Sequence, residues 1–213
     1  MKSSKKLISF FAGLSLALFL LCSSVIFSLN FKPLYSFDVD NLNISAEVNI
    51  PKEKILKNYD ILIDYLSPFN KKNLEFKDFP MSQEGRVHFI DVKNLFNKIS
   101  FLWIITFALS LITIAYLLKI KDFSFLKYSY SMLIMIPLLL FIPFAISFDK
   151  TFTKFHEIFF SNDYWLFDPV KDPIINILPE KFFLHEAILI LFIMCIFSLV
   201  LFFIHKSKKE SNL

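Results

Sequence analysis

Four long apolar runs alternate with polar stretches of unequal length along the chain. Each run has about 20 or more residues with almost no charge, which is enough for an α-helix to cross the hydrocarbon core of a bilayer. The pattern therefore predicts four membrane-spanning helices, at about residues 7–29, 99–118, 128–148 and 185–204. The first run is longer than a typical signal-peptide core and no small-x-small cleavage site follows it, so we expect it to be retained.

The connections between these runs differ in length and character. We expect two long segments, at about residues 30–98 and 149–184, and one short loop at about 119–127. Apolar residues recur at helical spacing between Pro51 and Ser67, which predicts a helix there. The stretch "DFPMSQEGRVHFIDVKNLFNKISFLW", which begins at Asp78, runs directly into the second span and is expected to be the outer end of the same helix. The fold class is therefore an all-α integral membrane protein with one membrane domain over residues 1–213 and four transmembrane helices.

Composition supports a membrane protein. Apolar residues make up 55% of the chain and aromatic residues 18%, with 29 Phe and two Gly, which is too apolar for a soluble domain of this length. Cys22 and Cys195 both lie inside apolar runs and are expected to be buried residues rather than a disulfide. We expect membrane lipid, and no nucleic acid, among the partners.

The distribution of lysine predicts the orientation. The N-terminal tail, the short loop and the C-terminal tail carry nine Lys against only Asp122 and Glu210. Because short cytoplasmic segments are enriched in Lys and Arg, both termini are expected in the cytoplasm. The two long segments then face outward and are expected to form a small extracytoplasmic domain.

The first outward segment ends in "EGRVHFID", residues 84–91, which holds the only Arg of the chain. On a helix, Glu84, His88 and Asp91 lie on one face. A carboxylate one turn from a histidine can fix its tautomer, as is common for a general base. The same spacing is also found in ordinary surface histidines, so spacing alone leaves both interpretations open.

The second outward segment carries His156 and a tryptophan, Trp165, of the kind common at membrane interfaces. "HEIFF" begins like the zinc-protease motif H-E-x-x-H, but Phe160 stands where the second histidine must be. His88, Asp91 and His156 have the residue types of a two-histidine, one-carboxylate metal site. Nothing beyond residue type favours such a site, and we expect neither a metal nor another cofactor.

Two blocks in these segments resemble a known family. "ExRxHxxDVKxLF" precedes the second span and "FHxxFFxxDxWLFxPxxDxxIxxLPxxFF" precedes the fourth. In a chain of this size with four spans, they resemble the bacterial lipoprotein intramolecular transacylase (Lit) family. The resemblance covers the topology of the whole chain and is most specific at about residues 82–97 and 152–183.

The resemblance implies an acyltransferase of the bacterial plasma membrane whose site faces outward. Such enzymes move an acyl chain from the diacylglyceryl group of a lipoprotein's N-terminal cysteine to the α-amino group of that cysteine, which gives the lyso-form. Diacylated lipoproteins are then the substrates, and no soluble cofactor is needed. The residues it implies are His88, His156 and Asp91 for catalysis, and Glu84, Arg86, Asp163 and Trp165 for substrate binding or support of the site.

The sole arginine fits this interpretation. A guanidinium can hold a carboxylate or carbonyl through two parallel hydrogen bonds, which an ammonium group cannot do. We expect Arg86 to contact Glu84, Asp91, an acidic residue of the second block, or the substrate. Two other functions remain open: a membrane assembly or accessory protein without catalysis, and a metal-dependent membrane hydrolase.

Overall fold

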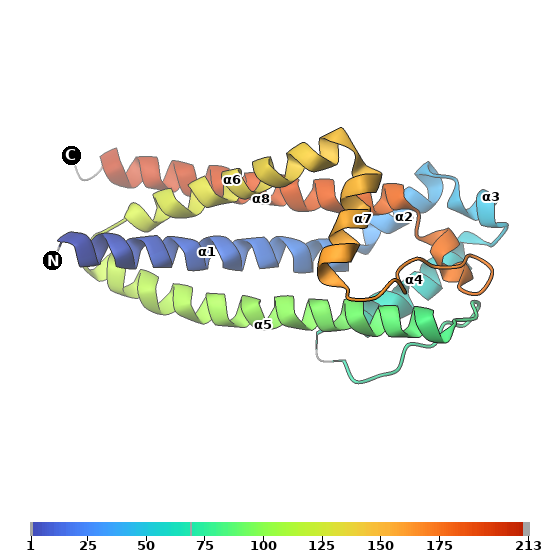
Figure 1. Ribbon diagram of the computed structural model, residues 1–213. Helices are drawn as coiled ribbons and strands as arrows, with labels where there is room; N and C mark the ends of the chain where they lie inside the picture. Colours follow the sequence, from blue (N-terminus) through green and yellow to red (C-terminus); the bar gives the residue numbers. More distant parts are fainter. Residues whose placement is uncertain (1, 69, 211–213) are drawn as a thin grey trace. The chain divides into compact units, whose positions relative to one another are not determined.

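The computed structural model describes residues 2–68 and 70–210, and within these ranges it contains helices and no strands. Figure 1 shows their arrangement along the chain. The helices are α1 (Lys2–Asn30), α2 (Lys32–Asn41), α3 (Ile44–Val48), α4 (Lys52–Leu66), α5 (Gln83–Lys119), α6 (Ser124–Ile146), α7 (Phe148–Phe159), the 3-10 helix η1 (Pro173–Ile177) and α8 (Glu180–Glu210).

Four of these helices are long and apolar enough to cross a membrane: α1, α5, α6 and α8. The prediction of four apolar spanning helices in an all-α protein is therefore confirmed. The predicted continuity of the stretch from Asp78 with the second span is confirmed from Gln83 onward, because α5 is one uninterrupted helix of 37 residues. At about 1.5 Å per residue, such a helix is longer than a bilayer core is thick, so only part of α5 needs to span.

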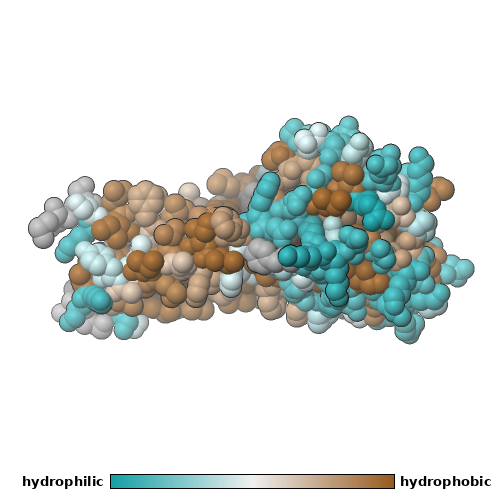
Figure 2. Space-filling view, turned by 90° about the horizontal axis from the view of Figure 1, so that it is seen from below, coloured by the Kyte–Doolittle hydropathy of each residue, from teal (hydrophilic) through white to brown (hydrophobic). Residues whose placement is uncertain are grey.

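The chain divides into two compact units. The first, called here the span unit, comprises Met1–Phe27, Ile99–Ala145 and Ile188–Leu213; the second, the connecting unit, comprises Ser28–Lys98 and Ile146–Ala187. Figure 2 shows apolar residues over most of the visible surface of the spanning helices, while hydrophilic residues gather on the connecting unit. The outward-facing large side chains of the span unit, such as Ile112 at 70% exposure, are those expected to face lipid.

Small and polar residues let the spanning helices approach each other. A Cβ on Gly13 of α1 would meet the Cβ of Tyr128 in α6 at 2.5 Å and the carbonyl oxygen of Phe125 at 2.8 Å. The Ser129 hydroxyl donates to the Gly13 carbonyl at 3.0 Å, so glycine and serine together fix this close contact. Contacts between small residues and interhelical hydrogen bonds are the usual means of helix association where lipid removes the hydrophobic driving force.

The connecting unit has its own apolar core. Tyr35 of α2 stacks on Tyr59 of α4, with ring centroids 3.7 Å apart, and its hydroxyl donates to the carbonyl of Ile177 in η1 at 2.7 Å. Asn58 is fully buried, donates to Asp78 and accepts from the backbone of Lys77, which fastens the segment after α4 to that helix. As predicted, α4 is preceded by Pro51 and ends before Ser67.

Candidate active site

His88 lies on α5 within the connecting unit, outside the apolar part of that helix, and is only 6% exposed. Its ring packs edge-on against Phe160, at 5.0 Å between centroids, and against Phe167, at 5.3 Å. Its Nδ1 atom is buried and has no hydrogen-bond partner among the described residues. The imidazole is thus enclosed by aromatic rings that offer it no polar contact.

His156 lies one turn before the end of α7, and Ser147 is the N-cap of that helix. Its Nδ1 is 2.8 Å from the carbonyl oxygen of Phe152, one turn earlier. Because a carbonyl only accepts, Nδ1 carries the proton, and Nε2 of the neutral ring carries the lone pair. Trp165 stacks on the imidazole, with centroids 4.8 Å apart and planes inclined by 28°.

The structure brings together His88 of α5 and His156 of α7, which are 68 residues apart in sequence, with ring centroids 6.0 Å apart. Burial, and then the nearby His156, lower the pKa of His88 to about 4, against the opposing effect of Asp91. Burial also lowers the pKa of His156, although the Phe152 carbonyl opposes that shift. Both imidazoles are therefore neutral near pH 7, and each has a ring nitrogen able to accept a proton.

Asp91 does not make the expected hydrogen bond with His88. Its carboxylate accepts from the side-chain amide of Asn162 at 3.0 Å and is half-buried, while Glu84 is exposed. The prediction that a carboxylate one turn away fixes the His88 tautomer is not met here, because the histidine ring packs in the aromatic cluster while Asp91 binds Asn162 and Glu84 is exposed. Asp91 acts on His88 only through its charge.

The remaining predicted residues occupy different places. Asp163 is exposed, and its backbone carbonyl accepts from the Leu166 amide at 3.0 Å in the loop that carries Trp165. Arg86 is exposed and donates from Nη1 to the carbonyl of Leu74 at 3.4 Å. No ion pair joins it to a carboxylate in the part of the chain that the structure describes. The expected contact with Glu84, Asp91 or an acid of the second block is therefore not formed.

Sequence reasoning missed the residue that joins the two blocks. Asp172 is 3% exposed and accepts from the backbone of Ser82 at 2.7 Å and from its hydroxyl at 2.6 Å. The Ser82 hydroxyl in turn accepts from the amide of Gly85 at 2.9 Å, so Ser82 caps the start of α5. An aspartate before a proline, as in Asp172-Pro173, signals a turn in sequence, but nothing there points to a partner 90 residues away.

A second polar cluster lies at the start of α8. Nδ1 of His185 donates to both carboxylate oxygens of Asp38, at 2.8 and 2.9 Å, and Asp38 is fully buried. The neighbouring Glu186 accepts from the Ser28 hydroxyl. His185, at the start of the fourth apolar run, therefore has a specific partner within the connecting unit.

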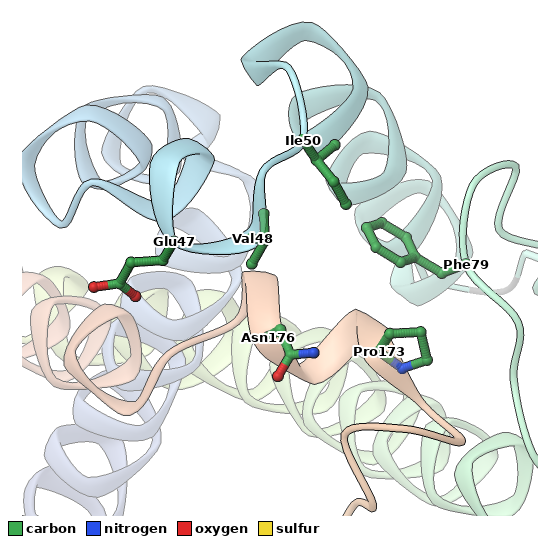
Figure 3. A pocket seen from close by; sticks show the side chains of 6 residues that line it. All are labelled: Glu47, Val48, Ile50, Phe79, Pro173 and Asn176. Carbon is green, nitrogen blue, oxygen red and sulfur yellow. The ribbon is translucent and has the colours of Figure 1, made fainter.

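Two further features bear on the chemistry. No group of three or more His, Cys, Asp or Glu with metal-binding geometry occurs among residues 2–68 and 70–210. An open hollow of about 510 Å³ lies on the connecting unit, shown in Figure 3. It is lined by residues of α3, η1 and the loops beside them, namely Glu47, Val48, Ile50, Phe79, Pro173 and Asn176, none of which belongs to the histidine cluster.

Comparison with known proteins agrees with the resemblance seen in the sequence. The family model for the lipoprotein intramolecular transacylase Lit matches residues 10–183. The solved structure of the membrane-integral transacylase Lit from Bacillus cereus is 38% identical, with a TM-score of 0.97, and the match covers 100% of this chain and 99% of that chain.

Two further structures of the Bacillus cereus protein, each with one histidine replaced, by arginine in one and by alanine in the other, also match at 38% identity. Their TM-scores are 0.91, and the matches cover 99% of this chain and 94% or 96% of those chains. No curated protein sequence matches the chain. With the family model covering most of its length, the chain belongs to the lipoprotein intramolecular transacylase Lit family of membrane acyltransferases.

Proposed function

We propose that this protein transfers an acyl chain from the diacylglyceryl group of a lipoprotein's N-terminal cysteine to the α-amino group of the same cysteine, and that His88 and His156 perform the proton transfers. The observation that carries the assignment of the two histidines is their pairing: two buried, neutral imidazoles with ring centroids 6.0 Å apart, enclosed by aromatic side chains. Family membership supports the reaction itself.

The reaction requires three things of the protein. A base must take a proton from the attacking amine, a donor must stabilise the oxyanion of the tetrahedral intermediate, and an acid must protonate the departing glycerol oxygen. A neutral imidazole can act as the base, and the imidazolium that results can act as the acid. Two neighbouring imidazoles can therefore act separately, one as the base and one as the acid. Alternatively, one imidazole takes the proton from the amine and returns it to the glycerol oxygen.

The arrangement of the substrate removes the need for other reactants. Ester donor and amine acceptor belong to one molecule, so attack is intramolecular and gains a large proximity advantage when the two groups are held together. The rings of Phe160, Phe167, Phe152 and Trp165 form the walls around the two imidazoles. Such walls exclude water, which would otherwise compete with the amine for the ester.

The orientation proposed is that of a plasma-membrane protein of a bacterium, with both termini in the cytoplasm and the histidine pair on the outer face. Its support is the excess of Lys in the two tails and the short loop. The test is cysteine labelling from outside in a background without Cys22 and Cys195. Position 170, in the connecting unit, should react with an impermeant reagent and position 121 should not; the reverse pattern would overturn the orientation.

The decisive experiment is mass spectrometry of a lipoprotein's N-terminal peptide from cells with and without this protein. We expect the lyso-form only when the protein is present, and its loss in His88→Ala and His156→Ala at matched membrane abundance. His205→Ala, on the tail side of α8, is the matched control and should keep most product.

The same experiment separates the other two functions. An assembly or accessory protein would tolerate both histidine substitutions. A metal-dependent hydrolase would lose activity with a chelator and recover it with zinc, and its product would be a free fatty acid rather than an N-acylated peptide. Either result would exclude the transacylase.

A further inference from the structure

The two tryptophans of the chain differ in one respect. The indole nitrogen of Trp103, in the span unit, donates to the hydroxyl of Ser23 at 2.8 Å. The indole nitrogen of Trp165, in the connecting unit, is buried and has no hydrogen-bond partner among the described residues. Buried indole N–H groups normally find an acceptor, so an unpaired one needs an explanation.

Trp165 is held in place by contacts that leave its N–H unused. The ring stacks on His156, and the loop that carries it is fixed by three hydrogen bonds. The Leu166 amide donates to the Asp163 carbonyl at 3.0 Å, the Tyr164 amide donates to the Asn162 side chain at 3.1 Å, and Asn162 donates to Asp91 on α5. The donor is thus fixed in position without an acceptor.

The position of this donor is significant because of its neighbours. Trp165 stacks on one proposed catalytic imidazole, and the other, His88, also has a buried nitrogen without a partner. The rings of both histidines pack against Phe160, which contributes no polar atom. Two of the unpaired buried polar atoms of the chain therefore belong to the same aromatic cluster, where a reacting ester would meet few other donors.

We propose that the indole N–H of Trp165 is the oxyanion donor of the acyl transfer, an inference that rests on the proposed function. A buried donor that has no partner among the described residues does not need to break a hydrogen bond to the protein when the oxyanion forms. That is the condition under which such a donor stabilises a transition state more than a ground state.

The acyl transfer passes through a tetrahedral intermediate. The neutral α-amine attacks the ester carbonyl carbon; the new C–N bond forms, and the carbonyl oxygen takes the electron pair and accepts a hydrogen bond from Trp165 Nε1. One proton of the amine passes to an imidazole. The intermediate then collapses, the bond from carbon to the glycerol oxygen breaks, and that oxygen takes a proton from an imidazolium. Ester and amine have become amide and alcohol, and both histidines are neutral again.

The first test is Trp165→Phe, assayed as purified protein on a synthetic diacylated lipopeptide in detergent micelles. Phenylalanine keeps an aromatic ring beside His156 and removes only the N–H. Loss of one oxyanion donor should lower kcat by roughly 100- to 1000-fold with little change in KM. Trp103→Phe is the matched control: it removes a satisfied hydrogen bond, so it should lower the melting temperature and leave kcat within a few-fold of wild type.

A second variant controls for the smaller ring of phenylalanine. Replacing Trp165 with benzothienylalanine, by suppression of a stop codon, keeps the bicyclic ring and exchanges the N–H for sulfur. The inference requires this variant to be as slow as Trp165→Phe. Wild-type kcat in either variant, or a change in KM alone, would overturn it. The proposed function would fail differently, because the wild-type enzyme itself would then produce no lyso-form.

Discussion

The carboxylate of Asp172 rests directly against the backbone of Gly85, so that a Cβ atom at position 85 would overlap an oxygen of Asp172 and would lie 3.0 Å from the ring of Phe167. Glycine in the first turn of a helix is unfavourable by itself. Here it makes room for the side chain that joins the second outward segment to the start of α5. His88 is three residues further along the same helix, so this contact also fixes the site.

We therefore expect Gly85→Ala to destabilise the protein, although alanine favours a helix by up to about 1 kcal/mol elsewhere. Overpacking of this kind costs roughly 1–3 kcal/mol. The measurement is thermal unfolding in detergent, with Glu84→Ala, an exposed neighbour on the same helix, as the control with little expected effect. Combining Gly85→Ala with Asp172→Ala should cost less than the two changes separately. A Gly85→Ala protein more stable than wild type would contradict the explanation.

The lowered pKa values of the two histidines predict the pH dependence of the rate. The attacking amine must be neutral, so the logarithm of kcat/KM should fall with a slope of one below about pH 7.7, the usual α-amine value. Histidines with the ordinary pKa would steepen this slope below about pH 6.5. Because His88 has a pKa of about 4 and that of His156 is also lowered, the slope should remain one as the pH falls through 6.5, and any steeper limb should begin only below that pH.

Asp91→Asn is the sensitive variant for this profile. The Asp91 carboxylate raises the pKa of His88, while an asparagine can still accept from Asn162, so the steeper limb should move to lower pH with the plateau rate within a few-fold of wild type. A plateau rate lowered more than 100-fold would instead make Asp91 a direct participant.

The stability of the protein should also depend on His88. The unfolded state binds the His88 proton more tightly, so stability falls as the pH falls from about 6.5 towards 4.

The spans and the helical character of the first outward segment could be predicted from sequence because they depend on local periodicity and length. The pairing of His88 with His156 could be anticipated only through the resemblance to a family. The contacts made by Asp91 and Asp172 could not be predicted, since each depends on a partner 71 or 90 residues away. Helical spacing placed Glu84, His88 and Asp91 on one face correctly, but which of them is covered depends on the loop after α7.

The substitution Arg86→Lys tests whether the sole arginine acts on the substrate. The one hydrogen bond of its guanidinium within the described chain is a long contact to the Leu74 carbonyl, which a lysine can also make. We therefore expect Arg86→Lys to leave the melting temperature unchanged. If the guanidinium holds the substrate through two hydrogen bonds, activity should fall roughly ten- to hundred-fold, which corresponds to about 1.5–3 kcal/mol. Lys71→Gln, which removes an exposed charge on the same unit, is the control. Wild-type conversion by Arg86→Lys would mean that only charge is needed there.

The contact between Asp38 and His185 should matter for stability and not for chemistry. Asp38 is fully buried, and His185 contacts both of its carboxylate oxygens, so His185→Ala leaves a buried carboxylate without this partner. Removal of one member of a buried pair costs roughly 3–5 kcal/mol. Lys32→Ala is the matched control: its pair with Asp60, at 2.7 Å, is about half exposed on each side and should be worth less than about 1 kcal/mol. Thermal unfolding in detergent measures both, and Asp38→Asn in the His185→Ala background should recover part of the loss.

Conversion of lipopeptide by His185→Ala, measured well below its melting temperature, should be near wild type. A His185→Ala protein that melts like wild type but cannot convert the substrate would move this histidine from the core into the reaction.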